Sequence, residues 1–138
     1  MPHRLARVSL ALALTGTLAL GNAQTDQVEL RWLGTAATSV FAESAAEIVA
    51  HDPASQRLFV VNAQSGQLDV IDIADPAAPR FVATVQVGAD GEVANSVDVH
   101  DGLVAVAVEA AEKTDPGRVA FLDAEGRLLA SVQVGALP

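Results

Sequence analysis

Beyond its first residues, the chain alternates short apolar runs with turn residues such as Gly, Pro, Asn and Asp. The runs are rich in valine and several have a period of two, which is typical of β-strands. No capped run of helical period follows residue 23. The pattern therefore predicts an all-β fold, with strands at 47–51, 58–63, 67–73, 81–87, 96–100, 103–109, 118–123 and 128–134.

Two stretches of the chain repeat each other. VATVQVGA at 82–89 recurs as LASVQVGA at 129–136, and two earlier runs end in His-Asp, EIVAHD at 47–52 and SVDVHD at 96–101. A repeat of about 40 to 50 residues made of four strands is typical of a β-propeller blade. The sequence predicts two four-stranded antiparallel sheets, blade 1 at 46–93 and blade 2 at 94–138. A ring needs about four to eight blades, so we expect an incomplete propeller whose chain ends where a further blade would start.

Local patterns add detail to this prediction. Asp101-Gly102 is a two-residue hairpin signal that accepts positive φ at both positions. The Val-Ala alternation of 103–108 leaves neither face polar, so both faces of that strand should be covered. The last strand of each blade interleaves polar residues, which suits the outer rim of the blade.

The first residues have the character of an export signal. Arg4 and Arg7 precede an apolar stretch at 8–20 and then Gly-Asn-Ala, so we expect a signal peptide at 1–23 and an exported protein, periplasmic, extracellular or at the cell surface. An uncleaved anchor would need about 20 apolar residues. Residues 24–45 are expected to be a lead-in, with one strand at 27–33 followed by a loop.

The composition limits the partners. The net charge is −9, and loss of the two signal arginines leaves 6 basic residues against 17 acidic ones, a net charge of −11. Such a chain repels nucleic acid and anionic lipid. The acidity either attracts cations or basic partners or simply keeps an exported protein soluble. There is no cysteine, hence no disulfide framework.

Four oxygen-bearing residues are the candidate site. In an antiparallel blade, the start of the first strand and the end of the second lie at the same end of the sheet. This places Glu47, Asn62, Asn95 and Glu109 toward one mouth of the channel, with Asn62 and Glu109 as counterparts if VVNA is aligned with AVEA. Such ligands suit a hard cation such as Ca²⁺, and two blades would supply a partial site. The alternative is that these side chains only close strand-end hydrogen bonds and turns.

No stronger catalytic signal is present. His51 and His100 occupy matching places in the His-Asp runs and are expected to bond to the following Asp turn rather than to form a metal or acid–base pair. The sequence has no G-x-S-x-G, H-E-x-x-H, EF-hand or P-loop motif. A single tryptophan, Trp32, gives no support to base stacking.

Several motifs resemble a known family. The segment VVNAQSGQLDVIDIADPAAPRFVATVQV at 60–87 resembles the LVIVD repeat of secreted bacterial propellers. AAEI at 45–48, NSV at 95–97, AVAVE at 105–109 and GALP at 135–138 look like the opening blades of the choice-of-anchor I proteins. The resemblance covers about 34–138 and implies a longer secreted or cell-surface propeller. Relatives are labelled alkaline-phosphatase-like or resemble a cell-surface glycoprotein linked to biomineralisation.

Three functions follow as hypotheses. The first is a non-catalytic binding or surface-interaction module, the N-terminal portion of a propeller, with a protein, glycan or mineral ligand. The second, which rests on the resemblance and on the acidic mouth, is part of a metal-dependent, alkaline-phosphatase-like hydrolase. The third is a structural role through self-association at an open sheet edge.

Overall fold

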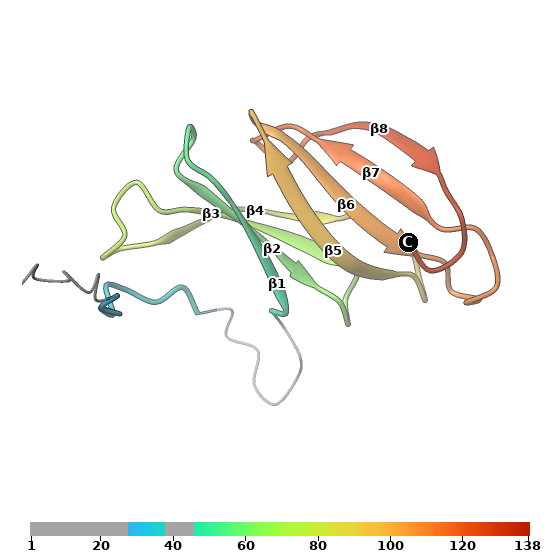
Figure 1. Ribbon diagram of the computed structural model, residues 1–138, viewed down its shortest axis with the longest axis horizontal. Helices are drawn as coiled ribbons and strands as arrows, with labels where there is room; N and C mark the ends of the chain where they lie inside the picture. Colours follow the sequence, from blue (N-terminus) through green and yellow to red (C-terminus); the bar gives the residue numbers. More distant parts are fainter. Residues whose placement is uncertain (1–27, 38–45) are drawn as a thin grey trace, which may run out of the picture. The chain divides into compact units, whose positions relative to one another are not determined.

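The computed structural model describes residues 28–37 and 46–138 (Figure 1). All the strands lie within the unit Trp32–Pro138. They form two four-stranded antiparallel sheets in the order β1-β2-β3-β4 and β5-β6-β7-β8. We call these sheets blade 1 and blade 2. The all-β prediction with two up-and-down sheets is confirmed.

The strands fall close to the predicted runs. Blade 1 contains β1 (Ile48–Asp52), β2 (Arg57–Asn62), β3 (Gln67–Asp72) and β4 (Arg80–Gln86). Blade 2 contains β5 (Val93–His100), β6 (Leu103–Glu109), β7 (Arg118–Leu122) and β8 (Leu128–Gln133). The largest difference is at β5, which begins three residues before the predicted strand because Val93 and Ala94 pair with the end of β6.

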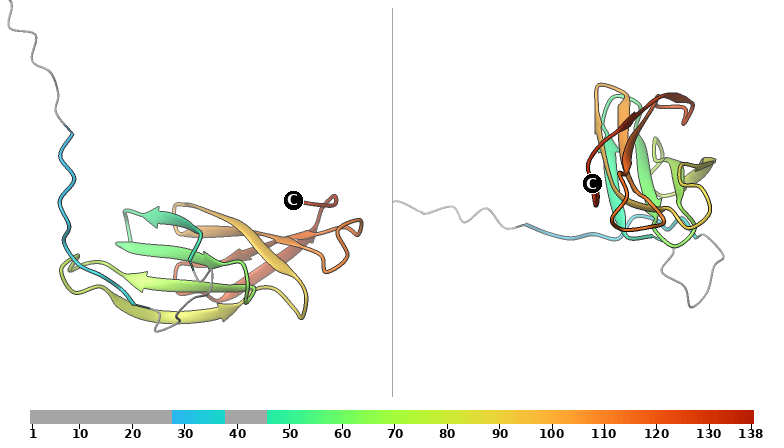
Figure 2. Two further views of the ribbon diagram at one scale, coloured as in Figure 1. Left: turned by 90° about the horizontal axis from the view of Figure 1, so that it is seen from below. Right: turned by 90° about the vertical axis from the view of Figure 1, so that its right-hand side faces the viewer.

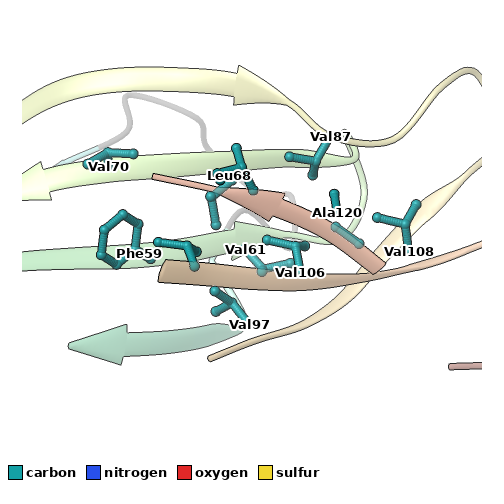
Figure 3. Close-up of a cluster of buried hydrophobic side chains, with 12 residues drawn as sticks. Phe59, Val61, Leu68, Val70, Val87, Val97, Val106, Val108 and Ala120 are labelled. Atoms are coloured by element: carbon teal, nitrogen blue, oxygen red, sulfur yellow. The ribbon is translucent and has the colours of Figure 1, made fainter. Parts of the chain in front are cut away.

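The two blades pack against each other through one face of each sheet. We call the face of blade 1 that contains Phe59, Val61, Leu68 and Val70 its front face, and all four side chains are fully buried. The back face of blade 2 meets it with Val97, Val104, Val106, Ala120 and Leu122, and the two faces form one hydrophobic core (Figure 3). Strand β1 lies beside β5, so the first strand of each blade is the inner one (Figure 1). Figure 2 shows the same two layers from two other sides.

The outer strands match their sequence pattern. Strands β4 and β8 lie at the far edge of each sheet, and every residue of β8 is exposed. Each outer strand also contains a bulge at the same place, Val82 in β4 and Leu129 in β8. A bulge increases the local twist of an edge strand and discourages pairing with another edge.

The hairpin between β5 and β6 is the predicted one. Asp101 and Gly102 have φ values of 49° and 77°, both positive, as a type I′ turn requires. Between β7 and β8, only Gly126 has a positive φ, at 83°. There the Asp123 carboxylate accepts hydrogen bonds from the backbone N–H groups of Glu125 and Arg127, which closes the turn.

The pairing register corrects the sequence alignment of the first two strands of each blade by one residue. Val61 faces Leu68 across blade 1, and in blade 2 the corresponding cross-strand pair is Ala107 with Val119. The counterpart of Asn62 is therefore Val108, not Glu109. By the same register His51, paired with Leu58, corresponds to Val99, paired with Val104. Because side chains alternate between faces, a one-residue shift puts the two histidines on opposite faces of their blades.

The prediction of a lead-in strand at 27–33 is wrong for residues 28–33, which the structure describes. Residues 28–37 contain no strand, and Val28, Leu30 and Trp32 are 90%, 96% and 80% exposed. The alternation of the sequence is that of a strand, but a strand forms only where a neighbour supplies backbone hydrogen bonds. The predicted signal peptide at 1–23 lies outside the described residues. Over those that are described, no helix has the length and apolar character to cross a membrane.

Candidate functional site

One end of the two blades collects the loops that carry the predicted site residues. Strands β1 and β5 start at this end and β2 and β6 finish there, because each pair is antiparallel. Both inner strands run upward in Figure 1, so the two blades present this end in the same direction. The loop face, as we name it, consists of 63–66, 88–92 and 110–117, together with the four predicted residues.

In blade 1, Glu47 and Asn62 are adjacent at the end of the β1–β2 pair. The backbone N–H of Glu47 donates to the carbonyl of Val61 at 3.1 Å, which extends the ladder by one bond. The side-chain oxygen of Asn62 accepts the N–H of Ser65 at 3.1 Å and so holds the turn into β3. Asn62 thus has the turn-closing role that the sequence left open as an alternative.

In blade 2, Asn95 and Glu109 contact each other directly. Asn95 is the extra residue of a bulge in β5, between the pairs Ala94–Val108 and Ser96–Ala107. Its Nδ2 donates to Glu109 Oε2 at 3.0 Å, and Lys113 Nζ lies 3.3 Å from Glu109 Oε1. Glu109 is 7% exposed, and its carboxylate contacts one amide group and one ammonium group.

The electrostatics follow from these contacts. The hydrogen bond from Asn95, assisted by Lys113, holds the pKa of Glu109 below its ordinary value, although burial acts in the opposite direction. The carboxylate is therefore ionised at neutral pH and matched to Lys113. Sequence analysis missed Lys113, although its position four residues after Glu109 was visible.

A calcium site at Glu47, Asn62, Asn95 and Glu109 stays a prediction. In the described residues, no group of three or more His, Asp or Glu side chains is placed to hold a metal ion. Both Glu109 oxygens already have partners, and Ca²⁺ prefers six to eight oxygen ligands. A cation at Glu109 would compete with Lys113 for the carboxylate.

The two histidines stay apart from this site. Both side chains are exposed, and His100 Nε2 lies 3.5 Å from the Asp101 carboxylate at the opposite end of the blade. Asp52, which follows His51, closes the turn after β1. Asp52 is buried and accepts hydrogen bonds from the Ser55 hydroxyl and from the N–H groups of Ala54 and Ser55, which lowers its pKa.

An arginine–glutamate pair that the sequence did not indicate joins the two blades at the loop face. Arg118, at the start of β7, donates to Glu92 Oε1 at 2.5 Å and to the carbonyl of Val87 at 2.7 Å. The other oxygen of Glu92 accepts the N–H of Ala89. Arg118 thus fixes the 88–92 linker against blade 2. At the opposite end, Arg57 similarly donates to the Ala124 carbonyl and to Glu125.

Three half-open pockets lie around this linker. The first, about 340 Å³, is lined by residues of the 63–66 and 88–92 loops with Gln86. The second, about 330 Å³, lies between Glu92, Arg118 and the residues Pro116 and Gly117. The third, about 280 Å³, opens between the blades and shares Arg118 and Ser131 with the second. Pockets near 300 Å³ are at the small end of the range for ligand sites.

The Arg118–Glu92 pair makes the inter-blade contact acid-sensitive. Hydrogen bonds from Arg118 and from the Ala89 N–H hold the pKa of Glu92 below its ordinary value of 4.5. A carboxylate with a lowered folded-state pKa stabilises the fold above its unfolded-state pKa, and this stability is lost as the pH falls through the folded value. We expect the melting temperature to fall between about pH 5 and pH 3, and to fall less in Glu92→Gln.

Thermal melts followed by circular dichroism across this pH range are the measurement. Glu112→Gln, at an exposed side chain on the same loop face, is the matched control and should retain the full acid sensitivity. An unchanged pH profile in Glu92→Gln would contradict the assignment.

The two stacked four-stranded sheets, with inner strands side by side, define a β-propeller-type protein. The chain belongs to the choice-of-anchor I family, because the sequence model of the choice-of-anchor I domain matches residues 47–138. The resemblance of the motifs to this family is therefore confirmed. A comparison with curated proteins gave no match.

Two solved structures match part of the chain. A europium-containing methanol dehydrogenase matches with a TM-score of 0.51 and 19% identity over 62% of this chain and 14% of its own. Hydrazine synthase of Kuenenia stuttgartiensis matches with a TM-score of 0.38 and 15% identity, over 65% of this chain and 37% of its own. The chain thus spans a small part of both proteins. The first likeness supports the propeller-type fold and nothing about chemistry.

Proposed function

We propose that the chain is part of an exported or cell-surface propeller module that binds a ligand through its loop face. The observation that carries this proposal is the grouping of three pockets around the 88–92 linker, at the loop face of the two blades. Loops on a rigid sheet scaffold are common positions for binding residues. Choice-of-anchor domains are typical of exported or surface proteins, which supports the location.

The chemistry of the loop face favours a polar ligand. Gln86 spans it by donating to the carbonyls of Ser65 and Gly88 at 2.8 and 2.7 Å, so the walls of the first pocket are held in place. Asp90 and Glu92 add carboxylates and Arg118 adds a guanidinium. Glycans and mineral surfaces offer hydroxyl groups and cations that suit such walls.

Filling the first pocket tests the proposal. Ser65 is exposed on its wall, so Ser65→Trp should block the pocket while its backbone N–H still bonds to Asn62. The purified chain is applied to a glycan array and to hydroxyapatite, and we expect it to bind at least one of them, with at least about tenfold weaker binding in Ser65→Trp.

The control is Ala54→Trp, which places the same bulk on the exposed β1–β2 turn at the opposite end. Equal binding by both tryptophan variants, or binding to neither probe, would contradict the proposal. We also expect no turnover of a chromogenic phosphate ester with or without Ca²⁺. Turnover that Glu109→Gln abolishes would favour the hydrolase instead.

A further inference from the structure

The two blades diverge toward their outer strands. One cross-strand row on the back face of blade 2 shows this: Val106 of β6 is fully buried, Ala120 of β7 is 2% exposed and Ser131 of β8 is exposed. All three side chains face blade 1, and only the outermost is left uncovered by it. The gap between the outer strands is the third pocket, of about 280 Å³, which we call the inter-blade groove.

The walls of this groove are mostly apolar and belong to blades 1 and 2 themselves. Val85 and Val87 line it from the end of β4, and Ala120 and Leu128 line it from the outer strands of blade 2 (Figure 3). Because a propeller stacks its blades face on face, a neighbouring blade would cover the other face of either sheet and leave this groove open. Apolar walls with a few polar groups are typical of binding sites.

Both ends of the groove are held by contacts between the blades. At one end the β7–β8 turn packs on blade 1, where an added Cβ at Gly126 would lie 2.9 Å from Val85 Cγ2. At the other end Arg118 donates to the carbonyl of Val87 at 2.7 Å and to Glu92. A site that is already formed loses less conformational freedom on binding, so the groove can hold one apolar side chain at low cost.

The groove continues into the first pocket, whose walls are polar and acidic. The two cavities share Gln86, Gly88 and Ala89 as lining residues. The first pocket adds the carboxylates of Asp90 and Glu92, and none of the described residues that line it is basic. A ligand that spans both cavities therefore meets apolar walls in one and carboxylates in the other.

The charge left over on this surface is negative. Acidic residues outnumber basic ones by 17 to 8 in the chain. Within 46–138, every arginine and lysine forms an ion pair with a carboxylate: Arg57, Arg80, Lys113, Arg118 and Arg127. The exposed carboxylate of Asp90 therefore lies in a field that attracts cations and repels anions.

We propose that the inter-blade groove and the first pocket together bind an extended segment of a partner protein, one that contains an apolar side chain and, close to it in sequence, a lysine or arginine. The apolar side chain lies in the groove beside Leu128, and the cationic side chain reaches Asp90. Alternate side chains of an extended segment are about 6 to 7 Å apart on one side, a spacing that suits two adjoining cavities. This goes beyond the proposed function, whose polar ligand occupies the first pocket alone.

An array of glycine–serine nonapeptides, each with one leucine and one lysine at a different spacing, is the probe. The purified chain should bind those peptides in which the two side chains are about one to three residues apart. The same peptides with glutamate in place of lysine should bind at least about tenfold more weakly. Fluorescence anisotropy of the best peptide gives its Kd, which we expect at about 0.1 to 1 mM.

Three variants test the groove. Ser131→Trp fills it from β8 and should weaken binding of the best peptide at least about tenfold. Leu128→Ser removes a 62% exposed apolar wall and should also weaken it. Ala130→Trp places the bulk of tryptophan on the opposite face of blade 2 and should leave binding unchanged. Circular dichroism verifies that the sheets form in each variant.

Asp90→Asn tests the acidic pocket. It should weaken the lysine peptide about two- to fivefold, the range of an exposed ion pair. Glu112→Gln, at another exposed carboxylate of the loop face, should not.

Equal binding of lysine and glutamate peptides would overturn the proposal, as would undiminished binding in both Ser131→Trp and Leu128→Ser. Binding to a glycan or to hydroxyapatite without binding to any peptide would overturn it and leave the proposed function in place. Peptide binding that is lost in Ser131→Trp, with binding to neither of those two probes, would support it and contradict the assignment of a glycan or mineral ligand.

Discussion

Phe59→Ala is expected to lower the free energy of unfolding by about 3 to 5 kcal/mol, the usual range for a buried phenylalanine. Phe59 is fully buried and lies where blade 1 packs on blade 2 (Figure 3). The change removes apolar contacts and leaves a cavity between two sheets. Since small domains are stable by only about 5 to 15 kcal/mol, this variant should approach the unfolding threshold. Urea unfolding at low protein concentration, followed by circular dichroism, is the measurement.

Two further variants make this prediction specific. Phe81→Ala removes the same side chain at a 42% exposed position and should cost much less. Phe59→Ala combined with Val70→Phe copies the Ala105–Phe121 arrangement of blade 2, so it should recover part of the lost stability. Equal losses in Phe59→Ala and Phe81→Ala would show that the inter-blade core does not dominate stability.

Gly126→Ala is expected to lower the free energy of unfolding by about 2 to 5 kcal/mol, through backbone strain and a steric clash together. Gly126 has a φ of 83°, and a side chain in the left-handed region costs about 1 to 2 kcal/mol. An added Cβ would also lie 2.9 Å from Val85 Cγ2 of blade 1, so either the Val85 side chain or the spacing of the blades would have to change. Overpacking of this kind typically adds about 1 to 3 kcal/mol.

Gly102→Ala is the matched control, because it has the backbone strain without the clash. Its φ is 77°, but the nearest atom to an added Cβ is 3.9 Å away. We expect a loss of about 1 to 2 kcal/mol, from strain alone. If both variants lose the same stability in urea unfolding, the Gly126 turn does not fix the spacing between the blades.

The candidate site was predictable only in part. The positions of Glu47, Asn62, Asn95 and Glu109 at strand ends followed from the repeat, and the hydrogen bond of Asn95 to Glu109 agrees with their expected proximity. Lys113 follows Glu109 by four residues, but in a loop this spacing does not predict whether the two side chains come into contact. The Arg118–Glu92 pair joins residues far apart in the sequence, and no spacing rule relates them.

The sequence also did not show which residues of the two blades are equivalent. The His-Asp runs match as letters, yet the hairpin after β1 has four loop residues at 53–56 and the hairpin after β5 has two at 101–102. Loop length changes the register without changing the apolar composition. Because a shift of one residue turns every side chain to the other face, letter matching could not decide which residues are equivalent.

The all-β class, the two four-stranded repeats, the outer place of β4 and β8 and the Asp101-Gly102 turn all follow from the amino-acid sequence. These depend on local rules, namely the period of two in strands and the backbone preferences of turn residues. Other features became known from the fold alone: which face of each blade is buried, that Asn62 and Glu109 are not counterparts, that 28–33 forms no strand, and that Arg118 binds the 88–92 linker. These depend on register and on contacts between distant segments, whose free energy arises when the two sheets pack and is absent from any short stretch of chain.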